Sequence, residues 1–319
     1  MPCEDRRAGE GFCADAGRTQ SGARRLRPVQ HFVLRLSGTA GRACQCGGPL
    51  PVLMELNSSA AAAGFRLAAF ATLPSTNTHA LALARGGEPG PLWVTALRQT
   101  EGRGRRGNQW ISPPGNLHAT LLLTDPAPPE CAAQASFVSA LAVHDAIIDR
   151  APSLRASLKL KWPNDVLCGG SKLAGILIEG EQTARGLAVA IGIGVNVRHH
   201  PEGTPYPATD LAAAGADVAA EALFAALSAA MLQRLGQWRR GAAFDLVRAD
   251  WLERAALLGG EMMVRLPGGE LTGRYESLDD RGCLMLRLGD GTLQTIAAGE
   301  VFPVVGAVAD RVSATARIE

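Results

Sequence analysis

Three apolar runs between residues 157 and 197 constrain the fold of this chain more than any other feature. They are "SLKLKW" (157–162), "KLAGILIEG" (172–180) and "GLAVAIGIGVNV" (186–197). Each is short, rich in Leu, Ile or Val, and bounded by Gly, Pro, Asn or Asp, a pattern typical of β-strands joined by turns. We therefore predict three successive strands, with turns at 163–165, at Gly169 and Gly170, and at Gly180.

Upstream of these runs, strand patterns are interspersed with helical ones. Residues 65–73, 92–98 and 117–124 predict strands. Ser75 or Thr76 can cap a short helix that ends at the Gly86-Gly87 pair. Longer helices are predicted over 131–149, 218–238 and 241–256. We expect residues 65–257 to form one α+β domain with a mixed sheet.

The residues after Gly259 and Gly260 show a different sequence pattern. "EMMVRLP", "ELTGRYESL", "CLMLRL", "LQTIAAG" and "VFPVV" are short apolar runs separated by "PGGE", "DDRG" and "GDG". Short strands at this spacing, with turn residues between them, predict a small β-barrel that resembles an SH3 module. We assign it to residues 258–319.

Residues 1–64 show no sustained periodicity and are rich in Arg, Gly, Ala and Cys. We predict irregular or disordered structure here, with "SSAAAAG" (58–64) as a linker. Translation starting at Met54 is a hypothesis that would make residues 1–53 an annotation artefact. Cys44 and Cys46, with His31 nearby, are interpreted as unpaired thiols in a loose tail rather than as a zinc site.

The overall composition excludes several classes of protein. The net charge of +2 does not point to nucleic acid. No apolar run approaches the length of a membrane span, and the charged N-terminus has no signal-peptide apolar region. Seven cysteines, an odd number at scattered positions, argue against a disulfide framework. These observations predict a cytoplasmic protein.

Lysine is restricted to one segment of the chain. Of 32 basic residues only Lys159, Lys161 and Lys172 are lysines, and all three lie within 14 residues. Arginine and lysine are not equivalent where a compact ammonium group is needed. We interpret the clustering as a real demand for lysine, with chance in an arginine-biased sequence as the alternative.

The segment "EGRGRRGNQW" (101–110) places Arg103, Arg105 and Arg106 among glycines. Glycines allow the backbone to approach a ligand, and arginines bind phosphate and carboxylate. The segment lacks the lysine of a Walker A loop, does not open a helix as a dinucleotide-binding G-x-G-x-x-G does, and occurs once, unlike RGG segments. We therefore predict a loop that holds an anionic ligand, against the alternative of a solvated basic loop.

Three further segments contain residues that could form part of a binding site. In "KWPND" (161–165) Asn164 and Asp165 project from a turn, although Asn and Asp are also ordinary turn residues. Lys172 begins the next strand, so we expect its ammonium group at the end of the sheet. In "GIGVNV" (192–197) two glycines leave one sheet face bare, either for a flat ligand or for close backbone packing.

In order and spacing these segments resemble the biotin protein ligases. The resemblance covers about 65–305, each motif alone is modest, and the ordered set is specific. The motifs are Ser75-Thr76-Asn77, Gln99 with Gly102 to Gly107 and Trp110, Lys161-Trp162-Pro163-Asn164-Asp165, Lys172-Leu173-Ala174-Gly175-Ile176 and Gly192-Ile193-Gly194-Val195-Asn196.

The resemblance implies a catalytic domain like that of class II aminoacyl-tRNA synthetases, followed by an SH3-like barrel. It also implies a reaction in two steps. The carboxylate of biotin attacks the α-phosphorus of ATP, which gives biotinoyl-AMP and pyrophosphate, and a lysine of the biotin carboxyl carrier protein then takes the biotinoyl group. Mg²⁺ would accompany ATP. Some family members carry an N-terminal winged helix, but residues 1–64 show no such pattern, so nucleic acid is disfavoured as a partner.

The resemblance assigns roles to individual residues. Lys172 and Arg105 would be catalytic, because fixed cations, Arg103 among them, must screen the repulsion between two anionic reactants. Asp165 is also a candidate Mg²⁺ ligand. The biotin contacts would be Ser75, Thr76, Asn77, Gln99, Arg103, Gly104, Arg105, Lys172, Gly192 and Gly194, and the ATP contacts Arg106, Trp110, Lys161, Asn164, Asp165 and Asn196.

Two other functions remain open at this point. A lipoate or octanoyl transferase of related fold would share the Lys172 strand but lack the full Arg-Gly segment. A biotin-sensing DNA repressor would need the winged helix. The sequence leaves the oligomeric state open, a homodimer included.

Overall fold

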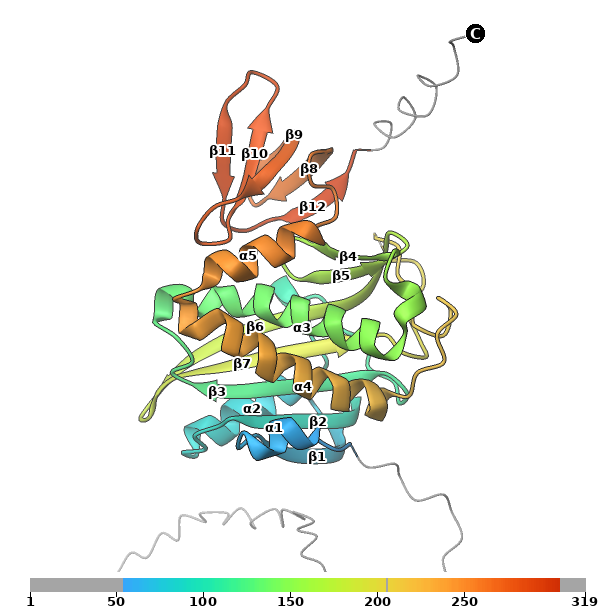
Figure 1. Ribbon diagram of the computed structural model, residues 1–319, viewed down its shortest axis with the longest axis vertical. Coiled ribbons are helices and arrows are strands. Elements are labelled where there is room, and N and C mark those ends of the chain that lie inside the picture. The colour runs from blue at the N-terminus through green and yellow to red at the C-terminus, as the bar shows by residue number, and fades with distance from the viewer. Residues whose placement is uncertain (1–53, 205, 305–319) are drawn as a thin grey trace, which may run out of the picture. The chain divides into compact units, whose positions relative to one another are not determined.

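The computed structural model describes residues 54–204 and 206–304 (Figure 1). The helices are α1 (Ser58–Ala62), α2 (Thr76–Arg85), α3 (Ala135–Arg150), α4 (Ala220–Trp238) and α5 (Phe244–Glu253), with 3-10 turns η1 (Arg105–Gly107), η2 (Pro129–Gln134), η3 (Pro152–Leu154) and η4 (Arg239–Gly241). The strands are β1 (Arg66–Leu73), β2 (Leu92–Gln99), β3 (Leu117–Thr124), β4 (Leu158–Lys161), β5 (Asp165–Cys168), β6 (Ser171–Thr183), β7 (Gly186–Val195), β8 (Glu261–Leu266), β9 (Gly269–Leu278), β10 (Leu284–Leu288), β11 (Leu293–Ile296) and β12 (Glu300–Pro303).

Strands β1 to β7 form one seven-stranded mixed sheet in the order β1-β2-β3-β7-β6-β5-β4. Only β1 and β2 run parallel, and the helix α2 connects them. The other neighbours are antiparallel, which confirms the predicted α+β class with a mixed sheet. Short turns join β4 to β5, β5 to β6 and β6 to β7.

Two details of the strand prediction are wrong. Gly180 does not make a turn, because it pairs with Val189 inside the β6–β7 ladder, and the chain reverses between Thr183 and Gly186. Asp165 does not end a turn but begins β5, a short strand that pairs with both β4 and β6. A four-residue strand is too short to show a period in sequence, so its neighbours define it.

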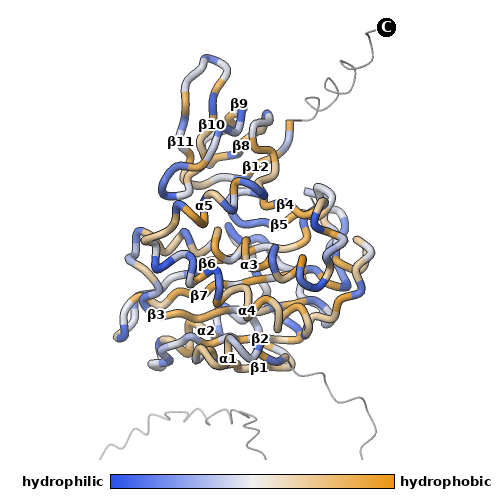
Figure 2. Tube along the Cα trace, viewed as in Figure 1, coloured by the Kyte–Doolittle hydropathy of each residue, from blue (hydrophilic) through white to orange (hydrophobic). Residues whose placement is uncertain are grey.

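The alternation of side chains along β7 separates the two faces of this sheet. Val189, Ile191 and Ile193 belong to the large apolar core under α3 and α4, which lie across that face in Figure 1. Ala188 and Ala190 belong to a second apolar cluster under α2, on the opposite face. Figure 2 shows apolar residues along the central strands and the helices that cover them. The period of two therefore places Gly192 and Gly194 on the α2 face.

One helical segment of the described residues, Pro129–Arg150, is long and apolar enough to cross a membrane. However, 78% of its most apolar window is buried inside the fold. It contains α3, whose side chains from Ala135 to Val143 are all buried. The segment therefore has the burial of a core helix.

The predicted linker at 58–64 is wrong, because Ser58–Ala62 forms helix α1. The Asn57 side chain caps this helix by accepting a hydrogen bond from the Ser59 amide at 3.0 Å. The Asn57 amide in turn donates to Ser228 Oγ on α4 at 2.9 Å, and Ala60 is fully buried. The predictions for residues 1–53, including the two cysteines of the C-x-C motif, lie outside the described residues.

The last five strands form a separate antiparallel sheet in the order β11-β10-β9-β8-β12. Their positions confirm the five strands predicted for this region. Trp162, which follows β4, donates a hydrogen bond from Nε1 to the Gly282 carbonyl of this unit at 3.0 Å. The division at residues 257 and 258, and the SH3-like closure of the sheet into a barrel, stay predictions.

Candidate active site

A cavity of about 470 Å³ lies on the glycine-bearing side of the large sheet and extends to β12 of the second sheet. All the predicted site residues except Arg106 line it. The lining contains Ser75, Thr76, Asn77, Gln99, Arg103, Gly104, Arg105, Trp110, Lys161, Asn164, Asp165, Lys172, Gly192, Gly194 and Asn196. Arg106 forms an exposed ion pair with Glu300 at 3.7 Å.

The Arg-Gly loop, residues 101–110, is a small hairpin beside this cavity. The Gly104 amide donates to the Asn108 carbonyl at 2.7 Å, and the Trp110 amide donates to the Gly102 carbonyl at 2.9 Å. Gly102 is required at the base of the hairpin, since a Cβ there would lie 2.5 Å from the Trp110 carbonyl oxygen. The hairpin directs its arginine side chains to different elements.

The sheet face beneath the loop is covered by protein side chains. A Cβ on Gly194 would lie 2.5 Å from Trp110 Nε1, and one on Gly175 would lie 3.3 Å from Trp110 Cζ3. Gly192 is likewise in contact with the Asn77 side chain. The two interpretations of "GIGVNV" are therefore combined: close packing requires the glycines, and the packed groups, Trp110 and Asn77, line the cavity.

Two of the three lysines converge on one carboxylate. Lys172 Nζ lies 2.7 Å from Asp165 Oδ1, and Lys161 Nζ lies 3.5 Å from Asp165 Oδ2. The β4–β5 hairpin pairs residue 161 with residue 165, and β6 follows beside β5, so strand pairing assembles the cluster. Lys159 is exposed on β4 and does not line the cavity. The interpretation that the lysines are needed is therefore supported at Lys161 and Lys172 and not at Lys159.

The Lys161 ammonium group is buried under aromatic rings. It lies 3.8 Å from the centroid of the Tyr206 ring and 5.8 Å from that of Phe302 on β12. Burial lowers the pKa of Lys161, and the charge of Asp165 opposes that shift. Sequence reasoning missed both aromatic residues, which come from a long loop and from the second sheet.

Arg105 points into the cavity and has no carboxylate partner among the ion pairs of the described residues. Its Nη1 donates to Asn164 Oδ1 at 3.2 Å and to the Gly299 carbonyl at 3.5 Å. Burial, followed by the charge of Arg106, lowers the pKa of Arg105, but a guanidinium stays protonated at neutral pH. Arg105 is therefore a fixed positive charge available to an anion.

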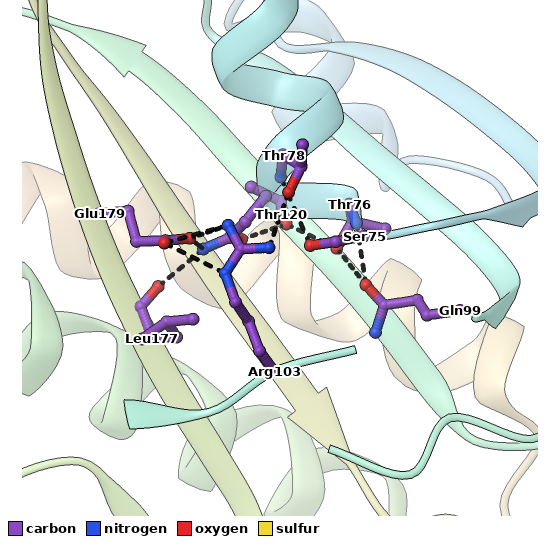
Figure 3. A network of polar contacts seen from close by, with 9 residues as sticks. Ser75, Thr76, Thr78, Gln99, Arg103, Thr120, Leu177 and Glu179 are labelled. Atoms are coloured by element: carbon purple, nitrogen blue, oxygen red, sulfur yellow. Dashed lines mark hydrogen bonds and ion pairs between the residues drawn. The ribbon is translucent and has the colours of Figure 1, made fainter. Parts of the chain in front are cut away.

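Arg103, which was also predicted to screen the anionic reactants, is instead paired with a carboxylate of the protein. Its guanidinium is bound to Glu179 on β6, with Nη2 2.9 Å from Oε2 and Nε 3.2 Å from Oε1. Figure 3 shows the two side chains facing each other. The positive charge of Arg103 is thus balanced by Glu179. The two lysines share the single carboxylate of Asp165, so together with Arg105 they keep positive charge in excess that can screen an anion.

Away from the lysines, the cavity is lined by polar groups, among which the charge of Arg103 is balanced by Glu179. The Thr76 amide donates to Gln99 Oε1 at 2.8 Å, and Gln99 Nε2 donates to Ser112 Oγ at 2.9 Å. Thr120 Oγ1 on β3 lies 2.8 Å from Thr76 Oγ1 and 2.6 Å from Asn77 Oδ1 (Figure 3). Such fixed donors and acceptors can orient a neutral polar group.

Glu179, Thr120 and Ser112 belong to this network and were missed from sequence. Strand alternation could have found two of them. Glu179 lies two and four positions after Leu177 and Gly175, which line the cavity on the same strand. Thr120 pairs with Gly192 and shares its face. Ser112 carries no such signal.

Ser75, Asn164 and Asn196 have local structural bonds in addition to their place at the cavity. Ser75 is the N-cap of α2, as predicted, and Oγ accepts from the Thr78 amide at 3.4 Å. Asn164 Nδ2 donates to the Ile176 carbonyl at 2.7 Å, and Asn196 Nδ2 donates to the Thr209 carbonyl at 3.0 Å. These bonds fix the two amides at the cavity wall.

The donor set does not fit a resident magnesium ion. In the part of the chain that the structure describes, no three His, Cys, Asp or Glu side chains are grouped to hold a metal. The carboxylate of Asp165 lies between two ammonium groups, which oppose a bound dication. A magnesium ion here would have to be held by a ligand that carries its own phosphates.

His118 on β3 lies next to Gly194 in the β3–β7 ladder and is 1% exposed. Burial lowers its pKa to about 4, although a hydrogen bond to the Pro113 carbonyl at 3.2 Å acts the other way. Above pH 6.5 the ring is neutral in both the folded and the unfolded chain, so burial of His118 does not lower the free energy of unfolding there.

We expect the free energy of unfolding to fall by about 3 kcal/mol between pH 6.5 and pH 4 on account of His118 alone, because only the unfolded chain takes up the proton in this range. Urea denaturation of wild type and of His118→Gln across this range measures the difference. His118→Gln should lose that part of the pH dependence, whereas the exposed His199→Gln should keep it. Equal slopes for wild type and His118→Gln would contradict the prediction.

Comparison with known proteins gives consistent matches. Residues 69–196 match the biotin/lipoate A/B protein ligase family, and residues 258–302 match the biotin protein ligase C-terminal domain. The chain is 42% identical over 235 residues to a biotin–[acetyl-CoA-carboxylase] ligase of Paracoccus denitrificans, which covers 72% of this chain and 96% of that protein. It is 35% identical to a protein of the same name from Mycobacterium tuberculosis over 71% of this chain and 85% of that protein.

The fold has a counterpart among solved structures. The biotin protein ligase of Aquifex aeolicus, solved in complex with biotin and ATP, matches with a TM-score of 0.64 at 24% identity, covering 75% of this chain and 99% of that one. At this identity the likeness shows the fold alone. With the family match, it confirms the predicted α+β fold of the class II aminoacyl-tRNA synthetase type.

Proposed function

This chain belongs to the biotin/lipoate A/B protein ligase family and is an ATP-dependent biotin ligase, and we propose that the cavity described above is where it activates biotin as biotinoyl-5′-AMP. The biotinoyl group then passes to a lysine of a biotin carboxyl carrier protein. The observation that carries this proposal is one cavity that contains both a network of polar groups and the cations Lys161, Lys172 and Arg105.

The polar end suits the neutral ureido head of biotin. Ser75, Thr76 and Gln99 offer hydroxyl and amide groups there, and the buried Thr120 bonds to Thr76 and Asn77 from behind. The glycines allow Trp110 and Asn77 to pack as walls of the cavity. The valeryl chain then directs the biotin carboxylate toward Lys172 and Arg105. Both are cations, so they lower the repulsion that a carboxylate meets on approaching a phosphate.

The cationic end suits ATP. Trp110 offers an aromatic face, and the charges of Lys161, Lys172 and Arg105 suit the phosphates. In the first step a carboxylate oxygen forms a bond to the α-phosphorus and pyrophosphate leaves with its electron pair. In the second step the carrier's lysine amine attacks the acyl carbon, AMP leaves, and the amine loses a proton. Mg²⁺ enters as part of the MgATP substrate.

The proposal also covers the carrier protein, the compartment and the oligomeric state. The carrier protein is the biotin carboxyl carrier protein of acetyl-CoA carboxylase, as the names of the relatives suggest. We place the protein in the cytoplasm, where its described cysteines, Cys131, Cys168 and Cys283, would remain free thiols. A homodimer is compatible with all these features.

Pyrophosphate release tests the substrate. With ATP and biotin the purified protein should release pyrophosphate, and with ATP and lipoate it should not. A preference for lipoate would assign the chain to the lipoate branch of the same family. The sequence identity of 42% and 35% to proteins named as biotin ligases favours biotin as the substrate.

Gly194→Ala should raise the KM for ATP about 10-fold, because the new methyl group would displace Trp110 from the cavity wall. Gly180→Ala is the matched control, since its Cβ would meet Leu187 at an ordinary 3.6 Å. Steady-state kinetics at saturating biotin provides the measurement. A KM in Gly194→Ala equal to that of the control would remove Trp110 from nucleotide binding.

A further inference from the structure

The Glu179 carboxylate is a junction between three elements. It accepts three hydrogen bonds from Arg103 of the Arg-Gly loop, between 2.9 and 3.2 Å. Its Oε2 also accepts from Asn77 Nδ2 on α2 at 2.7 Å. Since Glu179 is itself on β6, one carboxylate connects the loop, the helix and the sheet.

Arg103 completes this junction from the other side. Its Nη1 donates to Thr78 Oγ1 in the first turn of α2 at 2.6 Å (Figure 3). The guanidinium is therefore held in a fixed plane by two acceptors on two elements. A planar fork bound in this way restricts both the position and the orientation of residue 103.

The same network reaches the other end of the loop. Asn77 Oδ1 accepts from Thr120, which also contacts Thr76, and Thr76 contacts Gln99. Gln99 donates to Ser112, and Ser112 Oγ donates to the Trp110 carbonyl at 3.1 Å. The two ends of the hairpin, Arg103 and Trp110, are thus joined through the polar end of the cavity.

This pair differs from a neighbouring ion pair on the same strand. Glu181, two residues on, binds Arg85 of α2 at 2.8 Å with side chains 35% and 54% exposed. The Glu179 and Arg103 side chains are 28% and 33% exposed and share several hydrogen bonds. Exposed pairs contribute little to stability, whereas a less exposed, multidentate pair restrains its partner.

We propose that Glu179 is a positioning residue that holds the Arg-Gly loop over the biotin end of the cavity, acting through Arg103 and Asn77, and thereby sets how long biotinoyl-AMP stays bound. This role rests on the proposed function. Glu179 does not have to touch the reacting atoms, because it fixes the groups that cover them. Loss of the carboxylate charge should therefore affect binding and retention more than the chemical step.

Glu179→Gln in the full-length protein is the first test. It keeps an oxygen for Asn77 but removes the charge that binds Arg103. The KM for biotin and the rate at which biotinoyl-AMP escapes without carrier protein should each rise about 10-fold, whereas kcat at saturating substrates should change less than about 3-fold. Rapid filtration of enzyme loaded with labelled biotin measures the escape rate.

Glu181→Gln is the matched control on the same strand and face, and it should behave as wild type. Arg103→Gln should reproduce the effect of Glu179→Gln. The double variant should release biotinoyl-AMP no faster than either single variant, since both substitutions remove the same contact between Arg103 and Glu179. Thr78→Val, an exposed position that leaves the core intact, should move the escape rate in the same direction by a smaller factor.

The outcomes separate this role from the function on which it rests. Wild type and Glu181→Gln must first form biotinoyl-AMP from ATP and biotin, and failure there overturns the proposed function. If they form it and Glu179→Gln retains it as wild type does, the positioning role is wrong. Effects of Glu179→Gln and Arg103→Gln that simply add would also overturn it, because Glu179 would then not act through Arg103.

Discussion

Lys172→Ala will lower the rate of biotinoyl-AMP formation about 100-fold or more at saturating biotin and ATP. Lys172 lines the cavity and is the cation closest to Asp165, at 2.7 Å, and its ammonium group lies 5.6 Å from the Trp110 ring centroid. In the proposed mechanism, removing it takes away a charge that would screen the approaching anions. It also leaves Asp165 with the more distant Lys161 alone. Both effects oppose a carboxylate that attacks a phosphate.

Single-turnover formation of labelled biotinoyl-AMP is the appropriate measurement, because it separates chemistry from transfer to the carrier protein. Lys159→Ala is the matched control, since Lys159 is an exposed lysine on β4 that does not line the cavity. It should form the adenylate at the wild-type rate. A Lys172→Ala variant as fast as Lys159→Ala would remove Lys172 from the mechanism.

Arg105→Gly will release biotinoyl-AMP early and label bystander lysines. In the structure Arg105 connects the Arg-Gly loop to Asn164 on one side and, on the other, to the Gly299 carbonyl, which directly precedes β12. We expect loss of these charged hydrogen bonds, and of the positive charge proposed to face the phosphate, to raise the escape rate of the adenylate about 10- to 100-fold. A released acyl adenylate then reacts with any accessible amine.

Mass spectrometry of a mixture of the enzyme and an unrelated lysine-rich protein measures this labelling. Arg105→Ala separates the loss of the side chain from the added backbone freedom of glycine and should show most of the effect. Arg98→Ala, an exposed arginine on β2, should label only the carrier protein. Labelling by Arg105→Gly that stays confined to the carrier would contradict the role of Arg105 in retention.

Most helices and strands followed from the sequence, because their periods are local properties. The strands at 65–73, 92–98 and 117–124 and the helix capped by Ser75 correspond to β1, β2, β3 and α2. The errors are in places where local pattern is weak. Strand β5 is defined by its two neighbours, and helix α1 depends on a capping residue and a hydrogen bond to α4.

The predicted site residues were brought together for a related reason. The motifs stand at the ends and turns of adjacent strands, so strand pairing gathers them on one face of the sheet. Their individual roles stay predictions. Tyr206 and Phe302, which lie outside the motifs, carry no sequence signal, since they reach Lys161 from a long loop and from another sheet.

The sequence by itself determined the order of the elements, the face on which Gly192 and Gly194 lie, and the set of motifs that resembles a family, because all of these depend on spacing along the chain. Only the tertiary structure decided which charges are paired. Arg103 and Glu179 are 76 residues apart, and the Coulomb attraction between them depends on a distance that folding alone sets. That pairing leaves Arg105, and not Arg103, as the guanidinium free to meet an anion.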